Sequence, residues 1–252
     1  MTAQKFVKLT ECADRSYDHF AETVKSYQAE GYVIGGFGKM DKLWESKRSI
    51  IMRHDIDFSL KSALSLAGLE DILGISATYF ISIHRPHYSP LTSETRKTVH
   101  SLLDHGHEIG LHYEPEFDDL QAEIDMLEHY LDCSIVAIAR HNPFGNRIDV
   151  DKSNKPGSII DAYGDSIMKD FKYLSDSSGI WREGCFCGWC KHPERSRLQV
   201  LIHPEWWAAN TLDPVAHLQE INSVWTDGMK AIADKAVRNL QIHRDKIQHG
   251  EA

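Results

Sequence analysis

The sequence predicts a single α/β domain in which a parallel β-sheet is covered by helices. Two observations lead to this fold class. The chain has 252 residues, 42% of them hydrophobic, which suits one complete core. Short runs of β-branched and aromatic residues alternate with segments of helical periodicity, and this βαβα order is typical of parallel sheets. We therefore expect one domain over residues 1–252.

The expected elements follow one another in regular alternation. Strands are predicted at residues 49–54, 75–82, 108–112, 135–139, 159–163, 171–174 and 198–202. Helices are predicted at residues 17–29, 59–73 (with Ser59 as N-cap), 93–105, 117–131 and 213–248. The last helix carries an approximate apolar stripe. We expect it to pack across the outside of the sheet, with self-association into a homo-oligomer as the alternative.

Charge and composition argue against several classes of partner. The formal net charge is -9 and the basic residues are spread along the chain, so nucleic acid is not an expected partner. The N-terminus lacks the apolar core of a signal peptide, and no stretch approaches the roughly 20 apolar residues of a membrane span. Five cysteines without paired spacing favour a reducing compartment. We expect a cytoplasmic protein without disulfides.

Two carboxylates follow the first buried strand. Asp55 and Asp57 are two residues apart, so strand periodicity directs both side chains to the same face. Like charges held together raise one pKa unless a cation lies between them, which predicts a shared proton or a metal ion. A helix cap or an exposed turn is the alternative for these residues.

A histidine ends the strand at residues 108–112. Ile109 and Leu111 alternate with Gly110 and His112, so the imidazole of His112 points away from the two aliphatic side chains. Imidazole is a common zinc ligand, and we expect His112 to share a metal with a carboxylate from another strand. His105, like His107, is expected on the surface turn before this strand.

Five segments, taken in order, resemble the motifs of NodB-type polysaccharide deacetylases. Residues 54–57 resemble the Asp-Asp first motif, and residues 106–112 the second motif up to its first metal-binding histidine. Residues 142–145, 176–181 and 201–204 are similar to the third, fourth and fifth motifs. The resemblance implies a distorted (β/α) barrel and a divalent metal. It also implies hydrolysis of a C–N bond other than a peptide bond, usually the acetamide of an N-acetylated sugar.

The resemblance also assigns roles to individual residues. It implies that Asp55 is the general base and that Asp57 and His112 hold the metal. His203 would protonate the departing amine, and Asp176 would orient or tune a histidine. This division is chemically reasonable, because a metal lowers the pKa of bound water and an amine leaves readily only when protonated. Zinc is the first candidate metal, and Mn, Fe, Co and Ni are the others.

The sequence departs from the family pattern at two places. Ile56 separates the two carboxylates, and Glu116 stands where the family has its second metal-binding histidine. Glu116 is our first choice for the third ligand, and His141 and Glu114 are alternatives. In the third motif the family has an arginine that pairs with the base, whereas Arg140 is displaced here by one residue. We expect either that His141 takes the inward position or that a bulge restores Arg140 to it.

Aromatic residues near the motifs are candidates for sugar binding. We predict substrate contacts for Phe144, Trp181, Trp206 and Trp207, with core packing as the alternative.

Cysteines are gathered near the fourth motif. Cys187, Cys190 and His192 have the spacing of zinc ligands, but a second pair of ligands is not evident in the sequence. We therefore expect Cys185, Cys187 and Cys190 to pack as small apolar side chains.

Two functional hypotheses follow. The first is a metal-dependent deacetylase of an amino sugar or sugar conjugate in polysaccharide metabolism, with a non-sugar amide as the neighbouring substrate class. The second is a deacetylase-like protein that binds carbohydrate, or regulates, without catalysis. Tightly held metal would favour the first hypothesis.

Overall fold

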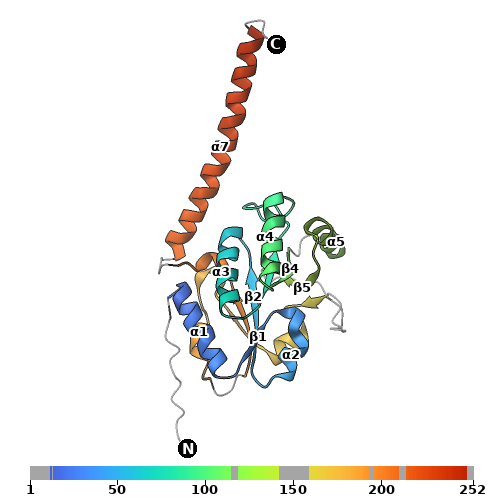
Figure 1. Cartoon of the computed structure of the whole chain (residues 1–252), viewed down its shortest axis with the longest axis vertical. Helices are drawn as coiled ribbons and strands as arrows, with labels where there is room; N and C mark the ends of the chain where they lie inside the picture. The colour runs from blue at the N-terminus through green and yellow to red at the C-terminus, as the bar shows by residue number, and fades with distance from the viewer. Residues whose placement is uncertain are drawn as a thin grey trace, which may run out of the picture. The chain divides into compact units, whose positions relative to one another are not determined.

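The computed structural model of the chain describes residues 12, 14–114, 119–141, 159–192, 196–209 and 214–248. The chain divides into two compact units, Met1–Pro214 and Val215–Ala252. The first unit contains the sheet and its surrounding helices, and the second is formed by the C-terminal helix α7 (Figure 1).

Every strand pairing in the described part of the chain is parallel. The strands are β1 (Val33–Gly35), β2 (Ser49–Asp55), β3 (Thr78–Ile81), β4 (Glu108–Tyr113), β5 (Ile135–Arg140), β6 (Ile160–Asp161), β7 (Lys172–Ser175) and β8 (Arg197–Ile202). Their order is β6-β5-β4-β3-β2-β8-β7, and β1 pairs with the first half of β2. No pairing among the described strands joins β6 to β7, so the sheet is a curled half-barrel. The predicted class, a distorted (β/α) barrel, is confirmed in this form.

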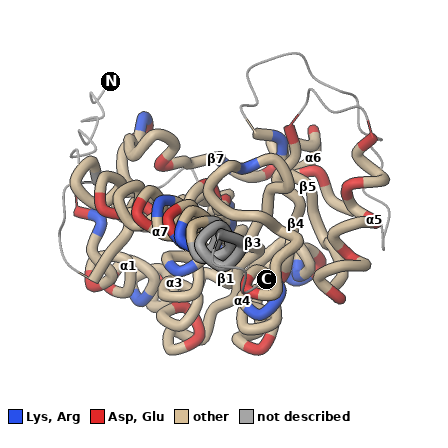
Figure 2. Tube along the Cα trace, turned by 90° about the horizontal axis from the view of Figure 1, so that it is seen from above, with Lys and Arg blue, Asp and Glu red and all other residues tan. Residues whose placement is uncertain are grey.

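Helices surround the sheet. The α-helices are α1 (Tyr17–Ala29), α2 (Met40–Glu45), α3 (Leu60–Ile72), α4 (Ser93–Asp104), α5 (Leu120–Leu131), α6 (Asp165–Asp170) and α7 (Pro214–Gln248). Short 3-10 helices are η1 (Phe37–Lys39), η2 (Ser177–Gly179), η3 (Phe186–Trp189) and η4 (Pro204–Trp206). Helices α1, α3, α4 and α5 form a belt in which each contacts the next. Acidic and basic residues are interspersed on α1, α3 and α4, whereas α5 carries acidic residues only (Figure 2).

Strand β2 is the centre of the sheet, because β1, β3 and β8 all pair with it. All seven of its residues are buried. Buried polar groups need partners, and β2 finds them on both of its faces. Arg53 and Asp55 pair with each other on one face, and His54 contacts the carboxylate of Glu70 in α3 at 2.9 Å on the other.

The pairing between His54 and Glu70 belongs to a buried network that includes His107. Tyr79 donates a hydrogen bond to Glu70, and His107 Nδ1 lies 3.7 Å from the same carboxylate. The prediction that His107 lies on the surface is therefore wrong, since its imidazole is buried and accepts a hydrogen bond from the Ala77 N–H. His105 is half-buried in the turn before β4, where it contacts the Asp71 carboxylate at 3.1 Å.

The predicted elements agree with the structure within a few residues. Helix α1 has the predicted bounds, and the Ser59 hydroxyl caps α3 by accepting a hydrogen bond from the Ser62 N–H. The elements that sequence analysis did not predict are short: β1, α2 and α6 have three to six residues each. Too few residues are present in such segments to show a periodicity.

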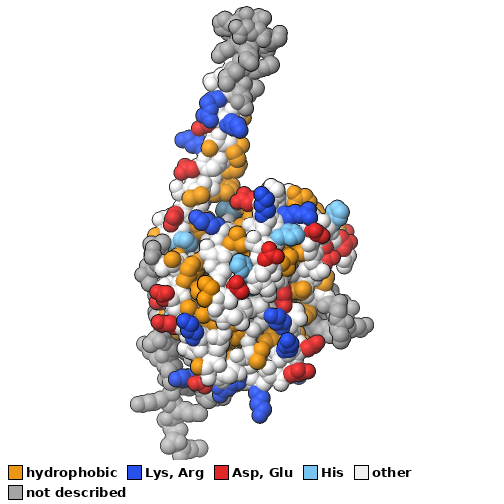
Figure 3. All heavy atoms as spheres, viewed as in Figure 1, with side chains coloured by type: hydrophobic (Ala, Val, Ile, Leu, Met, Phe, Trp, Pro, Cys, Tyr) orange, Lys and Arg blue, Asp and Glu red, His pale blue; other side chains and the backbone are white. Residues whose placement is uncertain are grey.

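Helix α7 has 35 residues, as the sequence predicted within one residue of its start. Several apolar side chains on it are exposed, among them Val224, Met229 and Ile232, and hydrophobic atoms are visible along it in Figure 3. Its packing across the sheet and its self-association both stay predictions. Among the described residues, neither α7 nor any other helix has the length and apolar character needed to cross a membrane.

Gly110 in β4 provides a test of the barrel interior. A Cβ added at this position would lie 2.5 Å from the Phe80 ring and 2.9 Å from the Ala137 carbonyl oxygen. We predict that Gly110→Ala lowers the free energy of unfolding by about 1–3 kcal/mol through overpacking. Urea denaturation followed by circular dichroism measures this change.

The matched control is Gly68→Ala in α3, where an added Cβ meets no atom within 4 Å. Alanine has the higher helix propensity, so this variant is expected to gain up to about 1 kcal/mol. Equal stability of the two variants would contradict the close approach of Phe80 to Gly110.

Candidate active site

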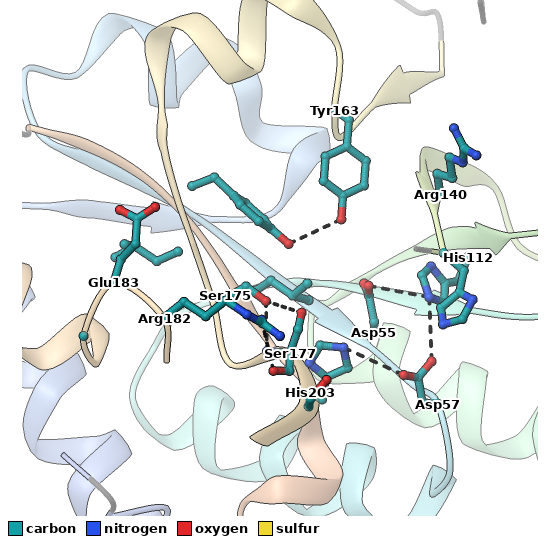
Figure 4. A pocket seen from close by; sticks show the side chains of 16 residues that line it. Asp55, Asp57, His112, Arg140, Tyr163, Ser175, Ser177, Arg182, Glu183 and His203 are labelled. Carbon is teal, nitrogen blue, oxygen red and sulfur yellow. Dashed lines mark hydrogen bonds and ion pairs between the residues drawn. The ribbon is translucent and has the colours of Figure 1, made fainter. Parts of the chain in front are cut away.

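A pocket lies at the carboxyl ends of the strands, where parallel α/β sheets collect functional groups. Asp55, Arg140 and Ser175 end β2, β5 and β7, while His112 lies near the end of β4 and His203 follows β8. The cavity has a volume of about 510 Å³. Its lining residues are Asp55, Asp57, His112, Arg140, His141, Tyr163, Tyr173, Leu174, Ser175, Ser177, Ser178, Arg182, Glu183, Gly184, Leu201 and His203 (Figure 4).

The Asp55 carboxylate is held by a buried guanidinium from its own strand. Arg53 donates two hydrogen bonds to Asp55, from Nε at 2.8 Å and from Nη2 at 2.7 Å. The guanidinium also lies over the rings of Phe80 and Tyr163. Burial opposes ionisation of Asp55, but the charge of Arg53 outweighs it and holds the pKa of this carboxyl well below its usual range. Asp55 is therefore an oriented anion.

Asp57, His112 and His141 converge as a group of metal-ligand type. One donor atom from each residue lies within 4.8 Å of the others. His112 Nε2 is 3.7 Å from Asp57 Oδ1 and 3.7 Å from Asp55 Oδ2. The two carboxylates therefore reach one pocket, as predicted, and His112 faces both of them (Figure 4).

The His112 imidazole has the form that a metal ligand needs. Its Nδ1 lies 2.9 Å from the Ala139 carbonyl oxygen, which assigns the N–H to Nδ1 and leaves a lone pair on Nε2. Burial lowers the pKa of His112, so the ring is neutral at pH 7. Nε2 is buried without a hydrogen-bond partner. A buried polar atom of this kind, aimed at two carboxylates, fits a divalent cation.

Arg85 and Glu114 lie beside this group. Arg85 Nη2 lies 3.1 Å from Asp57 Oδ1 and 3.5 Å from a Glu114 carboxylate oxygen. The Glu114 carboxylate also accepts a hydrogen bond from His141 Nδ1 at 3.0 Å. The negative charge of Asp57 is thus balanced by a nearby guanidinium.

His203 faces the same pocket from the other side of Asp57. Its Nε2 lies 3.8 Å from Asp57 Oδ2, and its Nδ1 lies 2.7 Å from Asp176 Oδ1. Burial disfavours the imidazolium, but the hydrogen bond and charge of Asp176 outweigh burial and raise the pKa of His203 to about 10. His203 is therefore protonated at neutral pH.

Asp176 is itself held by two further hydrogen bonds. Its Oδ1 accepts one from the His203 backbone N–H, and its Oδ2 accepts one from Trp207 Nε1 at 2.9 Å. Asp176 is fully buried and does not line the cavity. It therefore orients His203 without reaching the pocket.

Glu205 is a buried carboxyl beneath the site. Its Oε1 accepts a hydrogen bond from the Asp57 backbone N–H at 3.1 Å. Burial, followed by the charge of Asp57, raises the pKa of Glu205 to about 8. A protonated Glu205 supports the backbone of Asp57 without adding charge.

The structure gathers most of the predicted site residues. Asp55, Asp57, His112, Arg140, His141 and His203 line the cavity, and Asp176 lies directly behind His203. Arg140 and His141 both line it, so the expected choice between them does not arise. The expected arginine partner of the base is a different residue, because Arg53 makes the two hydrogen bonds to Asp55. Glu116 and Phe144 lie outside the described residues.

The tryptophans that were predicted to contact a sugar do not line the cavity. Trp207 is fully buried and packs against Phe20 and Phe186, so its ring face is not accessible to a sugar. The substrate contact predicted for Trp207 is therefore wrong. Trp181 packs against Phe186, and Trp206 is half-buried beside Phe58. Neither lines the cavity, where the aromatic residues are Tyr163 and Tyr173.

Sequence reasoning missed several residues of the site. Arg53 was detectable, because it precedes Asp55 by two strand positions and so shares its face. Glu205 follows His203 by two residues, but η4 separates it from any strand periodicity. Arg85 lies in a loop, and no pattern in the sequence connects it to Asp57.

Comparisons with solved structures give resemblances at low identity. A CE4 family pseudoenzyme from Bacillus anthracis is 13% identical, with a TM-score of 0.44 over 71% of this chain and 62% of that chain. This chain therefore spans less than two thirds of that protein's length. A family 4 carbohydrate esterase from Bacillus anthracis is 15% identical, with a TM-score of 0.43 over 81% of this chain and 85% of that chain.

A third structure that resembles this chain is a deacetylase from Streptococcus pyogenes in complex with acetate. It is 13% identical, with a TM-score of 0.42 over 81% of this chain and 85% of that chain. No family model matches the sequence. No curated protein matches it.

The pairing of Asp176 with His203 predicts a pH-dependent effect on stability. The pKa of His203 is raised from 6.5 to about 10, so the stability that this pairing contributes is fully present below about pH 6.5 and is lost as pH rises through about 10. We predict that Asp176→Asn destabilises the protein most below about pH 6.5, and that the difference from wild type narrows toward pH 10. Urea denaturation across this range measures it.

The same variant should lower the pKa of His203 by about one unit or more, as measured by NMR titration of the imidazole nitrogens. Asp170→Asn, at the end of α6 and exposed, is the matched control. A pH-independent loss of stability in Asp176→Asn would contradict a charged His203.

Proposed function

We propose that this protein is a metal-dependent hydrolase of a C–N bond that deacetylates an N-acetylated sugar or sugar conjugate. One observation carries the proposal. A carboxylate held ionised, a group of metal-ligand type and a protonated imidazole face a single cavity from four strand ends. These are the base, the cation site and the acid that amide hydrolysis needs.

Asp57, His112 and His141 would hold the metal. Their mixture of oxygen and nitrogen donors suits zinc, our first candidate, and also other divalent transition metals. When bound, the ion supplies Lewis acidity that lowers the pKa of water and polarises a carbonyl. Glu116 is not needed for a set of three protein ligands.

Asp55 is positioned to accept a proton from the attacking water. Arg53 engages both of its oxygens, so the carboxylate cannot rotate away from the pocket. The ion pair makes Asp55 a weak base. A weak base can accept a proton only from a water molecule whose pKa is lowered. A metal held by the neighbouring Asp57, His112 and His141 would lower the pKa of water in this way.

His203 is positioned to donate a proton to the departing nitrogen. In the balanced reaction, water adds oxygen to the acetamide carbonyl carbon and gives a proton to Asp55. The C–N bond then breaks, and the nitrogen takes the proton from His203 Nε2. The immediate products are acetic acid, which ionises to acetate, and an amine. The proton on Asp55 then replaces the one that His203 gave up, directly or through solvent, which restores both groups.

The cavity wall is suited to a polar ring. Its volume of about 510 Å³ is within the range of small-molecule sites. Tyr163, Ser177 and Arg182 offer hydroxyl and guanidinium groups to a sugar. We propose that these residues replace the tryptophans as sugar contacts.

A second candidate function is carbohydrate binding without catalysis. The observation that favours it is the ion pair of Arg85 with Asp57, because a guanidinium there neutralises the carboxylate that would otherwise attract a metal. Metal affinity of the pocket separates the two candidates.

The proposed function predicts the effect of two substitutions on hydrolysis. We expect Asp55→Asn and His203→Ala each to lower kcat/KM for N-acetylated sugar oligomers by at least about a hundredfold, since each removes a proton-transfer group. Release of acetate from metal-supplemented protein measures it. The control is Asp71→Asn, an exposed residue of α3 that contacts His105 away from the pocket.

Wild-type protein without turnover on a panel of N-acetylated sugars and simple amides, with each candidate metal added, would overturn the hydrolase proposal. Binding of the same sugars without turnover would support the second candidate.

The proposed function also predicts which substitutions weaken metal binding in the pocket. We expect Asp57→Asn and His112→Gln each to weaken zinc or cobalt binding at this site by at least about tenfold, because each removes one of three protein ligands. Isothermal titration calorimetry on the full chain measures the affinity. The controls are Asp71→Asn and His129→Gln, which are exposed. Equal affinities for all four variants would contradict the ligand assignment.

A further inference from the structure

A second group of metal-ligand type lies outside the pocket. It consists of Cys12, His19, Cys185 and Cys187, and one donor atom from each lies within 4.8 Å of the others. Cys12 precedes α1, His19 belongs to the first turn of α1, and the other two cysteines lie at the start of η3. We propose that this group binds a zinc ion that fastens the segment before α1 to the η3 loop. The proposal is independent of the pocket and of the proposed function.

The distances fit a tetrahedral ion. With usual zinc bond lengths, a sulfur and a nitrogen at two corners of the tetrahedron lie about 3.6 Å apart. His19 Nε2 lies 3.4 Å from Cys12 Sγ and 3.5 Å from Cys185 Sγ. Both distances therefore match edges of a tetrahedral zinc site.

The ligand types fit as well. Three thiolates and one imidazole form a closed four-ligand set of the kind found in structural zinc sites. In the sequence, Cys187, Cys190 and His192 have the spacing of zinc ligands but no second pair is evident, and apolar packing of the cysteines was therefore predicted. In the structure that pair comes from Cys12 and His19, more than 160 residues earlier in the chain. Cys190 and His192 are not part of the group.

Neighbouring residues suit the charge of such a site. Zinc with three thiolates and a neutral imidazole carries a net negative charge. Arg15 is buried beside it, and its Nη1 donates a hydrogen bond to the Cys12 carbonyl oxygen at 2.9 Å. The guanidinium also lies over the rings of Trp181 and Trp207. A buried cation is thereby placed where it compensates a thiolate cluster.

The group is linked to the pocket in two ways, through side-chain contacts and along the chain. The His19 ring is parallel to the Trp207 ring, with 6.2 Å between centroids, and Trp207 donates to Asp176, which holds His203. Along the chain, Gly184 lines the cavity and precedes Cys185. An ion at this group therefore stabilises one wall of the cavity and the support of His203.

Zinc content tests the proposal directly. The two sites are separated by placing Asp57→Asn and His112→Gln together in one background, which removes two ligands of the pocket. We expect this double variant to retain about one zinc per chain after gel filtration, as measured by elemental analysis. Adding Cys12→Ser or Cys187→Ser should remove that zinc. The matched control is Cys133→Ser, because Cys133 lies outside the group.

Cobalt provides a second readout that does not depend on activity. We expect cobalt-substituted double variant to show thiolate-to-metal charge-transfer absorption and the intense visible bands of a tetrahedral ion. Both signals should disappear with Cys187→Ser and persist with Cys133→Ser.

Folding of the cysteine variants is checked by circular dichroism. If a cysteine variant fails to fold, the double variant itself is titrated with a mercurial reagent, and about one zinc should be released as its thiols react. The proposal is overturned if anaerobically purified double variant holds no zinc and takes up no cobalt. It is also overturned if mass spectrometry shows a disulfide among Cys12, Cys185 and Cys187 in metal-free protein, or if Cys12→Ser and Cys187→Ser hold as much zinc as Cys133→Ser.

Discussion

The buried ion pair of Arg53 and Asp55 is the interaction on which the pocket depends. Both side chains are removed from water at the centre of the sheet, and each would be costly there alone. Removing one partner of such a pair typically costs about 3–5 kcal/mol, because the other charge is left uncompensated. The two hydrogen bonds also fix the direction of the Asp55 oxygens. Stability of the sheet and orientation of the candidate base therefore depend on the same pair.

A single indole connects the pocket with the cysteine group. Trp207 donates its N–H to Asp176 and presents its ring to His19. Because Trp207 is fully buried, both contacts are shielded from solvent. Trp207, which the sequence analysis predicted to contact a sugar, instead packs within the core. Its polar edge and its apolar face have different partners, which is a common use of tryptophan in protein interiors.

Sequence alone predicted the elements that have a strong periodicity. Helix α1 and strands β2, β4 and β8 were located within a residue or two, and their polar ends gave Asp55, Asp57, His112 and His203. The sequence could not predict groups that depend on contacts between distant segments. Arg85 reaches Asp57 from a loop, and Cys12 and His19 reach the η3 loop from the start of the chain. A tryptophan side chain can either pack in the core or stack on a sugar, and the sequence does not distinguish these two roles. The packing in the structure does.

The alternation of residues along β2 has a consequence for how this chain tolerates change. Arg53 and Asp55 face the barrel interior, while His54 faces the helical layer and contacts Glu70. Inserting or deleting one residue within the strand would exchange these faces. The charges of Arg53 and Asp55 would then face the helical layer, and the imidazole of His54 would face the barrel interior. Length variation should therefore be confined to the loops on either side of β2. The number of residues in the strand itself is fixed by the positions of Arg53, His54 and Asp55.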